Sequence, residues 1–312
     1  MLRSVKQHSL WLSLTVAMVL SLFGLSPALG TSAPAEGEST FSTELADLGQ
    51  EPRIEFRFGL RAGTIIETRT STTNETKVTY SSKMDLPFPK IPMVKAAFEM
   101  THRAHILEIL ADGKALIEQS LTHSEGSAGE VELPFLKELV GVVFTYKMDA
   151  RGTISDVTVK KGPGPSASQD AVDFMADLAP RSDTHSLALI MQPKAVGSGA
   201  IWKVHSITTQ QGKELKATYQ GTLTAITANS FNIVSQLTSE PTPEGLQPRV
   251  DTSGHTSAKY IKSMPTPQSF ESAFTTKARM DMNADGKSWT QGQDMKITVN
   301  TESKIVSQAQ AK

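Results

Sequence analysis

The sequence predicts a mainly β protein, built as a large curved antiparallel sheet (a half-open barrel) with one amphipathic helix packed on it. Three observations support this prediction. Many segments alternate apolar and polar residues, which puts the apolar side chains on one face of a strand. Asp-Gly turns separate neighbouring segments of this kind, as in hairpins. The 312 residues include no cysteine, so stability must come from a buried core and not from disulfides.

The first thirty residues have the features of a cleavable secretory signal peptide. Arg3 and Lys6 precede an uncharged apolar run at 10–25. This run is shorter than the roughly 20 residues that a membrane-spanning helix needs, although an uncleaved anchor is the alternative. Small residues then fit cleavage after Gly30 or after Ala35. We therefore predict an exported protein, periplasmic or extracellular, with no stable membrane span after cleavage.

The rest of the chain is expected to form one β-rich domain over residues 53–301. Residues 31–52 are small and acidic, which predicts a flexible tether, and residues 302–312 are expected to be a polar C-terminal tail. The domain begins with an alternating segment at 54–60, which places four large apolar residues on one face of a strand. Two hairpins are predicted further along the chain, one around Asp112-Gly113 and one around the turn at 149–152.

The second half of the predicted domain begins with the helix and continues with further strands. The helix is expected at about 168–179, where Phe174 and Met175 belong to one apolar stripe. Strands are predicted at 200–208, 215–225, 231–238, 259–264, 272–282 and 295–301. A long loop with three prolines is expected at 239–250.

Charge and motifs exclude several classes of function. The formal net charge is −1 for the chain and −3 without Arg3 and Lys6, which argues against a nucleic-acid partner. The segment 281–286 matches the start of a calcium loop, but the twelfth position is Gly292 and not glutamate, so we predict a plain turn. His102 and His105 fall on opposite faces of a strand and predict no metal site. We expect no catalytic residue, no metal and no cofactor.

A strongly apolar segment at 86–94 contains three prolines, which prevent it from forming a central strand. Two interpretations remain open. The segment folds back onto the core, as satellite clusters under long loops do. Alternatively, it forms a flap over an apolar cavity or an edge that binds a partner.

The segment 193–202 carries a family resemblance. Pro193, Val196, Gly197 and Trp202 follow each other with a spacing that resembles a family of exported bacterial β-rich proteins without an assigned reaction. That family is similar in layout to the periplasmic lipoprotein-carrier fold, a curved antiparallel sheet left unclosed. The resemblance implies an apolar cavity. Many members of the family are lipoproteins, whereas this chain lacks the cysteine that would carry the lipid.

The sequence therefore favours a non-enzymatic envelope protein that binds a lipid-like or hydrophobic ligand in the concave face of its sheet. A structural or adhesive module with a protein partner is the alternative, and a hydrolase is a weaker third hypothesis. The oligomeric state does not follow from the sequence. The expected ligand-binding residues are large and apolar, and they come from the Pro-rich segment, the second Leu-Pro-Phe segment, the helix and the strand after Gly199: Phe88, Ile91, Met93, Val94, Phe135, Phe174, Met175 and Trp202.

Overall fold

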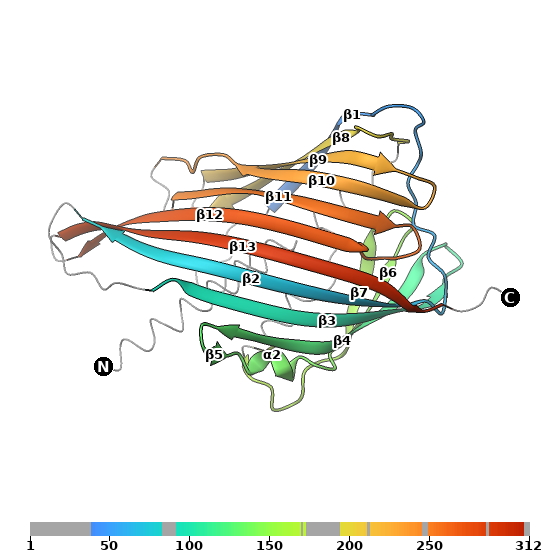
Figure 1. The fold of residues 1–312 in the computed structure, drawn as a ribbon, viewed down its shortest axis with the longest axis horizontal. Coiled ribbons are helices and arrows are strands. Elements are labelled where there is room, and N and C mark those ends of the chain that lie inside the picture. The colour runs from blue at the N-terminus through green and yellow to red at the C-terminus, as the bar shows by residue number, and fades with distance from the viewer. Residues whose placement is uncertain are drawn as a thin grey trace.

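The computed structural model describes residues 39–82, 92–169, 171–172, 194–210, 213–244, 249–284 and 287–308. Thirteen strands and one short helix follow each other along these residues (Figure 1): β1 (Ser39–Asp47), β2 (Ile65–Ser81), β3 (Val94–Ile109), β4 (Ala115–Ala128), β5 (Val131–Glu132), α2 (Phe135–Glu138), β6 (Val143–Met148), β7 (Ile154–Lys161), β8 (Ile201–Gln210), β9 (Lys213–Ile226), β10 (Ser230–Ser239), β11 (Arg249–Ile261), β12 (Ser269–Ala284) and β13 (Lys287–Ser307).

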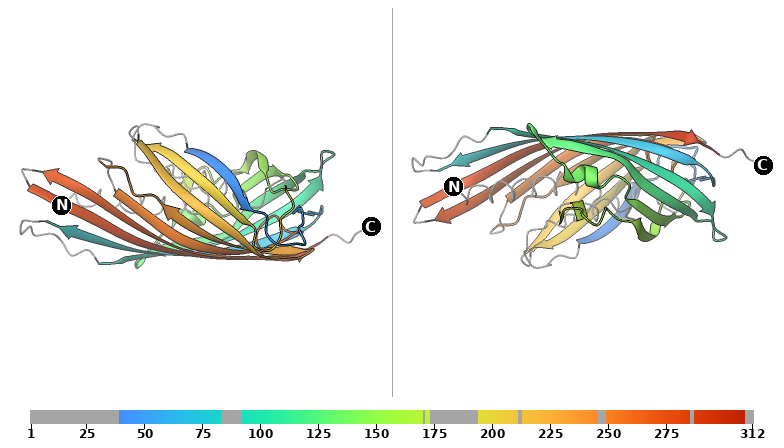
Figure 2. Two further views of the ribbon diagram at one scale, coloured as in Figure 1. Left: turned by 90° about the horizontal axis from the view of Figure 1, so that it is seen from above. Right: turned by 90° about the horizontal axis from the view of Figure 1, so that it is seen from below.

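All thirteen strands belong to one antiparallel sheet that is not closed into a barrel, which confirms the predicted fold class. The order is β1-β8-β9-β10-β11-β12-β13-β2-β3-β4-β6-β7, with β5 paired to β4 beside this path. The two ends of this order, β1 and β7, do not pair with each other. Figure 2 shows the sheet as a trough, with its two flanks turned toward the same side.

Local turns explain why neighbouring strands pair as predicted. The Asp112-Gly113 hairpin joins β3 to β4, and Gly113 has φ +81°, a conformation that glycine adopts without strain. The turn at 149–152 joins β6 to β7, where the Asp149 carboxylate accepts hydrogen bonds from the backbone N–H groups of Arg151 and Thr153, both at 2.8 Å. Both predicted hairpins are therefore confirmed.

The largest buried cluster, which we call the first cluster, fills one end of the trough. It includes Ile117 of β4 and Tyr146 of β6 from one flank, and Trp202 of β8 and Phe231 of β10 from the other. Because these strands lie far apart in the sheet order, a shared cluster requires the sheet to curve around it. We call the face of the sheet that carries these residues the inner face.

The segment between β1 and β2 crosses between the two flanks at this end (Figure 1). Phe56 packs its ring against Phe231, with 3.9 Å between the ring centroids, and against Phe58 at 5.5 Å. The backbone N–H of Phe58 donates to the carbonyl of Ala150 at 2.7 Å, and that of Gly59 donates to the carbonyl of Lys262 at 2.8 Å. The segment therefore connects the β6–β7 turn on one flank to the end of β11 on the other.

This segment was predicted to be a strand, and that prediction is wrong. Only Ile54 forms a bridge, with Val196, and the residues that follow are not in a strand. The alternation of apolar residues reflects burial of Phe56 and Phe58 in the first cluster and not pairing in the sheet. A period of two indicates which side chains are buried, whereas the hydrogen-bond partners depend on the tertiary fold.

A second cluster lies beneath α2 on the β3–β4 flank. Leu133, Leu136 and Leu139 pack there with Phe98 and Phe144, and all five are buried. Pro134 occupies the N-cap of α2, where its missing N–H leaves no helical hydrogen bond unmade. The sequence did not predict this four-residue helix, because so short an element has no measurable apolar periodicity.

Two predicted boundaries are also wrong. Residues 39–47, expected in the flexible tether, form β1 and pair with β8, where Leu45 lies opposite the buried Trp202. Residues 302–307, expected in the polar tail, extend β13 and pair with the start of β2, as in the pair Ser303–Thr68. Both segments are polar in composition, and pairing with a long neighbour gives their backbones the hydrogen bonds that hold them.

Some predictions fall on residues that the structure does not describe. The signal peptide at 1–30 lies outside the described residues, as does most of the Pro-rich segment at 86–94. Of the helix predicted at 168–179, only 168–169 and 171–172 are described, and Ala171 and Val172 are helical. Within the described part of the chain, no helix is long and apolar enough to cross a membrane.

Candidate functional site

The inner face of the central strands carries no formal charge. Over residues 66–76 of β2, 94–104 of β3, 270–276 of β12 and 293–303 of β13, every inner-face position is apolar, a hydroxyl, an amide or His102. The acidic and basic side chains of the same stretches all fall on the outer face, where several form ion pairs such as Lys304–Glu67 and Arg69–Glu99, both at 2.8 Å. The alternation of β-strands thus separates the charges from the inner face.

Apolar residues form the middle of this face. Met295, Ile297 and Val299 follow each other along the inner face of β13, and Phe270 of β12 packs against them. We call these four residues the third cluster. Its three β13 members are almost fully buried, at 1–2% exposure.

Beside the third cluster, β2 presents five polar residues to the same face. We call Thr68, Thr70, Thr72, Asn74 and Thr76 the polar stripe. The ends of the stripe have partners: the hydroxyl of Thr68 lies 2.9 Å from that of Ser303, and the hydroxyl of Thr70 lies 3.1 Å from that of Thr301. At the other end, the Thr76 hydroxyl donates to Asn74 Oδ1 at 3.3 Å.

The centre of the polar stripe is different. Within the described part of the chain, Thr72 Oγ1 and Asn74 Nδ2 have no hydrogen-bond partner, and neither has Ser272 Oγ on the inner face of β12. All three residues are at least 97% buried. Leaving a buried polar atom unpaired costs about 1–3 kcal/mol, so three neighbouring cases require a physical explanation.

A polar group also lies on the inner face close to the first cluster. His102 Nδ1 lies 3.4 Å from the side-chain nitrogen of Gln119, whose oxygen accepts a hydrogen bond from the Tyr146 hydroxyl at 3.3 Å. Burial lowers the pKa of His102 to about 4 from the ordinary 6.5. His102 is therefore neutral at pH 7, which keeps the inner face uncharged.

We expect acid to destabilise the fold through His102. Because the folded pKa of His102 lies below the unfolded value, the unfolded state binds more protons between pH 6.5 and pH 4. The contribution of His102 is fully present above pH 6.5 and is lost as the pH falls toward 4, by up to about 3 kcal/mol. Urea unfolding of His102→Gln should therefore show a smaller loss of stability from pH 7 to pH 4.5 than the parent protein. His105→Gln, on the outer face of the same strand, should keep the parental loss, and equal losses in all three proteins would refute this assignment.

The structure separates the ligand-binding residues that the sequence suggested. Val94 begins β3 and pairs with Thr76 of the polar stripe, and Met93 precedes it at 49% exposure. Phe135 packs against the second cluster and Trp202 belongs to the first cluster, so these two residues lie in different places. The remaining four predicted residues lie outside the described part of the chain: Phe88, Ile91, Phe174 and Met175.

Sequence reasoning missed the third cluster and the polar stripe. A signal was available, because residues 68–76 read Thr-x-Thr-x-Thr-x-Asn-x-Thr, a strict period of two with hydroxyls where core residues are expected. Met295, Ile297 and Val299 show the same period on β13. Their pairing across 219 to 227 residues of sequence, as in Val299–Thr72, could not be predicted from local pattern.

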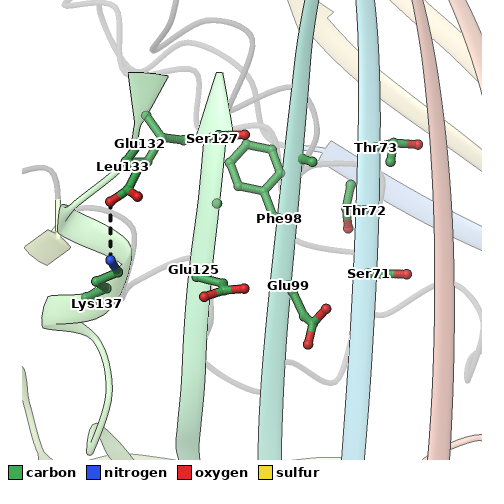
Figure 3. A pocket seen from close by; sticks show the side chains of 12 residues that line it. Ser71, Thr72, Thr73, Phe98, Glu99, Glu125, Ser127, Glu132, Leu133 and Lys137 are labelled. Carbon is green, nitrogen blue, oxygen red and sulfur yellow. Dashed lines mark hydrogen bonds and ion pairs between the residues drawn. The ribbon is translucent and has the colours of Figure 1, made fainter. Parts of the chain in front are cut away.

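A cleft of ≈ 400 Å³, bordered by Thr72 of the polar stripe and by Phe98, lies between β2, β3 and β4 on one side and β5 and α2 on the other (Figure 3). Three carboxylates line it, and each has a basic neighbour: Glu99 with Arg69, Glu125 with His123 at 3.8 Å, and Glu132 with Lys137 at 3.3 Å. Hydrogen bonding from Arg69 also lowers the pKa of Glu99. The part of the cleft beside these carboxylates does not suit an apolar ligand.

No family model matches the chain, and no curated protein matches it by sequence. Several solved structures resemble it with low scores. A lipovitellin structure titled for its lipid–protein interactions has 11% identity over 81% of this chain, with a TM-score of 0.41, and the chain spans only 26% of the lipovitellin chain. It also resembles an outer membrane channel from Pseudomonas putida F1, with a TM-score of 0.23 and 11% identity over 80% of this chain and 98% of the channel. A third similar structure is the P. putida toluene transporter TodX, with a TM-score of 0.18 and 8% identity over 80% of this chain and 91% of the transporter. Because these TM-scores are below 0.5, the likenesses do not decide the function.

Proposed function

We propose that this protein binds a lipid-like or other hydrophobic small molecule on the inner face of its sheet and does not catalyse a reaction on it. The leader that the sequence predicts at 1–30 supports the further proposal that this binding occurs outside the cytoplasm. One observation carries the proposal: the inner face of the central strands is free of acidic and basic side chains over the described stretches, while the outer face of the same strands carries many.

Physical chemistry links this separation of charge to an apolar ligand. A charge buried without a partner costs several kcal/mol, so a face that receives an apolar molecule must be free of charges. Sites for small hydrophobic molecules are concave and mostly apolar, with a few polar groups that orient the ligand. The trough supplies the concave shape, the buried third cluster supplies apolar side chains, and the polar stripe supplies the polar groups.

Two measurements test the proposal on the purified full chain. Native mass spectrometry of protein isolated after export should show adducts with the masses of lipids. The uncharged dye diphenylhexatriene should fluoresce on binding, with saturable titration. Absence of both signals would refute the proposal and favour the alternative of a module that binds a protein partner.

A matched pair of variants locates the binding face. Ala96 and Ala97 are neighbours on β3, but Ala96 is buried on the inner face and Ala97 is exposed on the outer face. Ala96→Asp should abolish dye binding because it adds a charge to the inner face, whereas Ala97→Asp should leave it unchanged. If Ala96→Asp fails to fold by circular dichroism, the isosteric Val299→Thr replaces it and should weaken dye binding about fivefold. Equal binding by the inner-face and outer-face variants would contradict the proposal.

A further inference from the structure

We infer that the ligand is an uncharged amphiphile, such as an acylglycerol or a long-chain ester or alcohol, whose polar group binds at Thr72, Asn74 and Ser272. This inference rests on the proposed function and names the chemical class of ligand for the same site. It starts from Thr72 Oγ1, Asn74 Nδ2 and Ser272 Oγ, three of the side-chain polar atoms that are buried without hydrogen-bond partners in the described part of the chain.

The three residues form one group on the inner face. Val299 of β13 pairs with Ser272 on one side and with Thr72 on the other, so the two hydroxyls lie in one row across the sheet. They are two strand spacings apart, roughly 10 Å. Asn74 lies two residues from Thr72 on the same face of β2, about 7 Å along the strand. A glycerol ester or similar group is large enough to reach two of these side chains together.

The sheet neighbours of the group are apolar, although Thr72 also borders the cleft lined by Glu99, Glu125, Glu132 and Lys137. Ile297 pairs with Asn74 and with Phe274 of β12, and Val299 lies between the two hydroxyls. Phe98 pairs with Thr72 from the β3 side. A polar group bound here is therefore flanked by the apolar side chains that would contact a hydrocarbon chain, as an amphiphile requires.

The chemistry of the three atoms defines the polar group. Asn74 already accepts a hydrogen bond from Thr76 through Oδ1, so its free Nδ2 offers only donors. The hydroxyls of Thr72 and Ser272 donate or accept. The set therefore suits a carbonyl, ester or hydroxyl oxygen, because each of these accepts a hydrogen bond from an amide.

The charges near the group exclude an anionic ligand group. Lys137, which lines the same cleft as Thr72, is paired with Glu132 at 3.3 Å, and Glu99 and Glu125 line that cleft too. No Lys or Arg lies on the inner face over the described central stretches, and His102 is neutral at pH 7 because burial lowers its pKa to about 4. A carboxylate or phosphate bound beside Thr72 would lose its hydration without gaining a counter-charge. The site therefore discriminates against fatty-acid anions and phospholipid head groups.

Competition against bound diphenylhexatriene tests this inference. At about pH 8, monopalmitoylglycerol should displace the dye at roughly tenfold lower concentration than palmitate, which has the same acyl chain and a negative charge. Hexadecane, which has no polar group, should displace the dye at a concentration between those of the ester and palmitate. Displacement by palmitate at the same concentration as by the ester would overturn the inference while leaving the proposed function standing. A protein that does not bind the dye would instead refute the proposed function.

Two isosteric variants provide the matched control. Thr72→Val removes the unpartnered inner-face hydroxyl, and Thr73→Val removes an exposed hydroxyl from the outer face of the same strand. Thr72→Val should weaken binding of the ester about fivefold and leave binding of hexadecane unchanged. It should also make the ligand-free protein no less stable, because it removes a buried polar atom that has no partner. Thr73→Val should change none of these, and Ser272→Ala should repeat the effect of Thr72→Val. A loss of affinity shared equally by ester and hexadecane would overturn the assignment.

Discussion

Gly197→Ala should destabilise the fold by about 3 kcal/mol or more. A Cβ at this position would lie 1.6 Å from the carbonyl oxygen of Gln50, which is a backbone atom and cannot rotate away. The backbones must approach closely here because the N–H of Gly197 donates to Leu48 at 2.8 Å and the N–H of Gln50 donates to Ser198 at 2.8 Å. These bonds hold the chain that leads from β1 to β2 against the start of β8.

Urea unfolding followed by circular dichroism measures this effect. Gly59→Ala is the matched control, because a Cβ at Gly59 would meet nothing within 4 Å. We expect Gly59→Ala to change the free energy of unfolding by less than about 1 kcal/mol. Similar losses in the two variants would show that the close approach at Gly197 does not contribute to stability.

Phe56→Ala should have the second large effect, a loss of about 3–5 kcal/mol in the free energy of unfolding. The Phe56 ring contacts Phe231 and Phe58, and Lys262 Nζ lies 5.4 Å from its centre. The residue thus belongs to the segment that joins the two flanks of the trough. Its removal leaves a cavity in the first cluster that the open sheet cannot fill without changing its curvature.

Thermal and urea unfolding of Phe56→Ala should be compared with Val159→Ala. Val159 lies on β7 at the edge of the sheet and is 48% exposed, so its truncation should cost less than about 1 kcal/mol. A loss for Phe56→Ala as small as that for Val159→Ala would contradict the role of segment 54–60 in holding the two flanks together.

The sequence was sufficient to predict the elements that depend on local chemistry. The turns at Asp112-Gly113 and 149–152 follow from the conformational freedom of glycine and the hydrogen bonds of aspartate, and both hairpins are confirmed. The mainly β class followed from the period of two. Both kinds of signal act over a few residues, so they can be recognised in the sequence without knowledge of the fold.

The elements that the sequence could not place depend on distant partners. β1 pairs with β8 and β13 pairs with β2, in each case with partners 154 or more residues away in the sequence, and nothing in residues 39–47 or 302–307 shows which strand they meet. Likewise, Phe56 and Phe58 alternate like strand residues although they pack at the end of the trough. The uncharged inner face becomes apparent only when the register aligns Val299 with both Ser272 and Thr72.

Photolabelling would show whether a hydrophobic ligand lies on the inner face of the sheet. A monoacylglycerol with a diazirine in its acyl chain would be bound, irradiated and mapped to single residues by mass spectrometry. We expect labels on Met295, Ile297 and Val299, and none on their outer-face neighbours Lys296 and Thr298. Labels on Lys296 and Thr298, or a β13 strand without labels on its inner face, would contradict binding on the inner face.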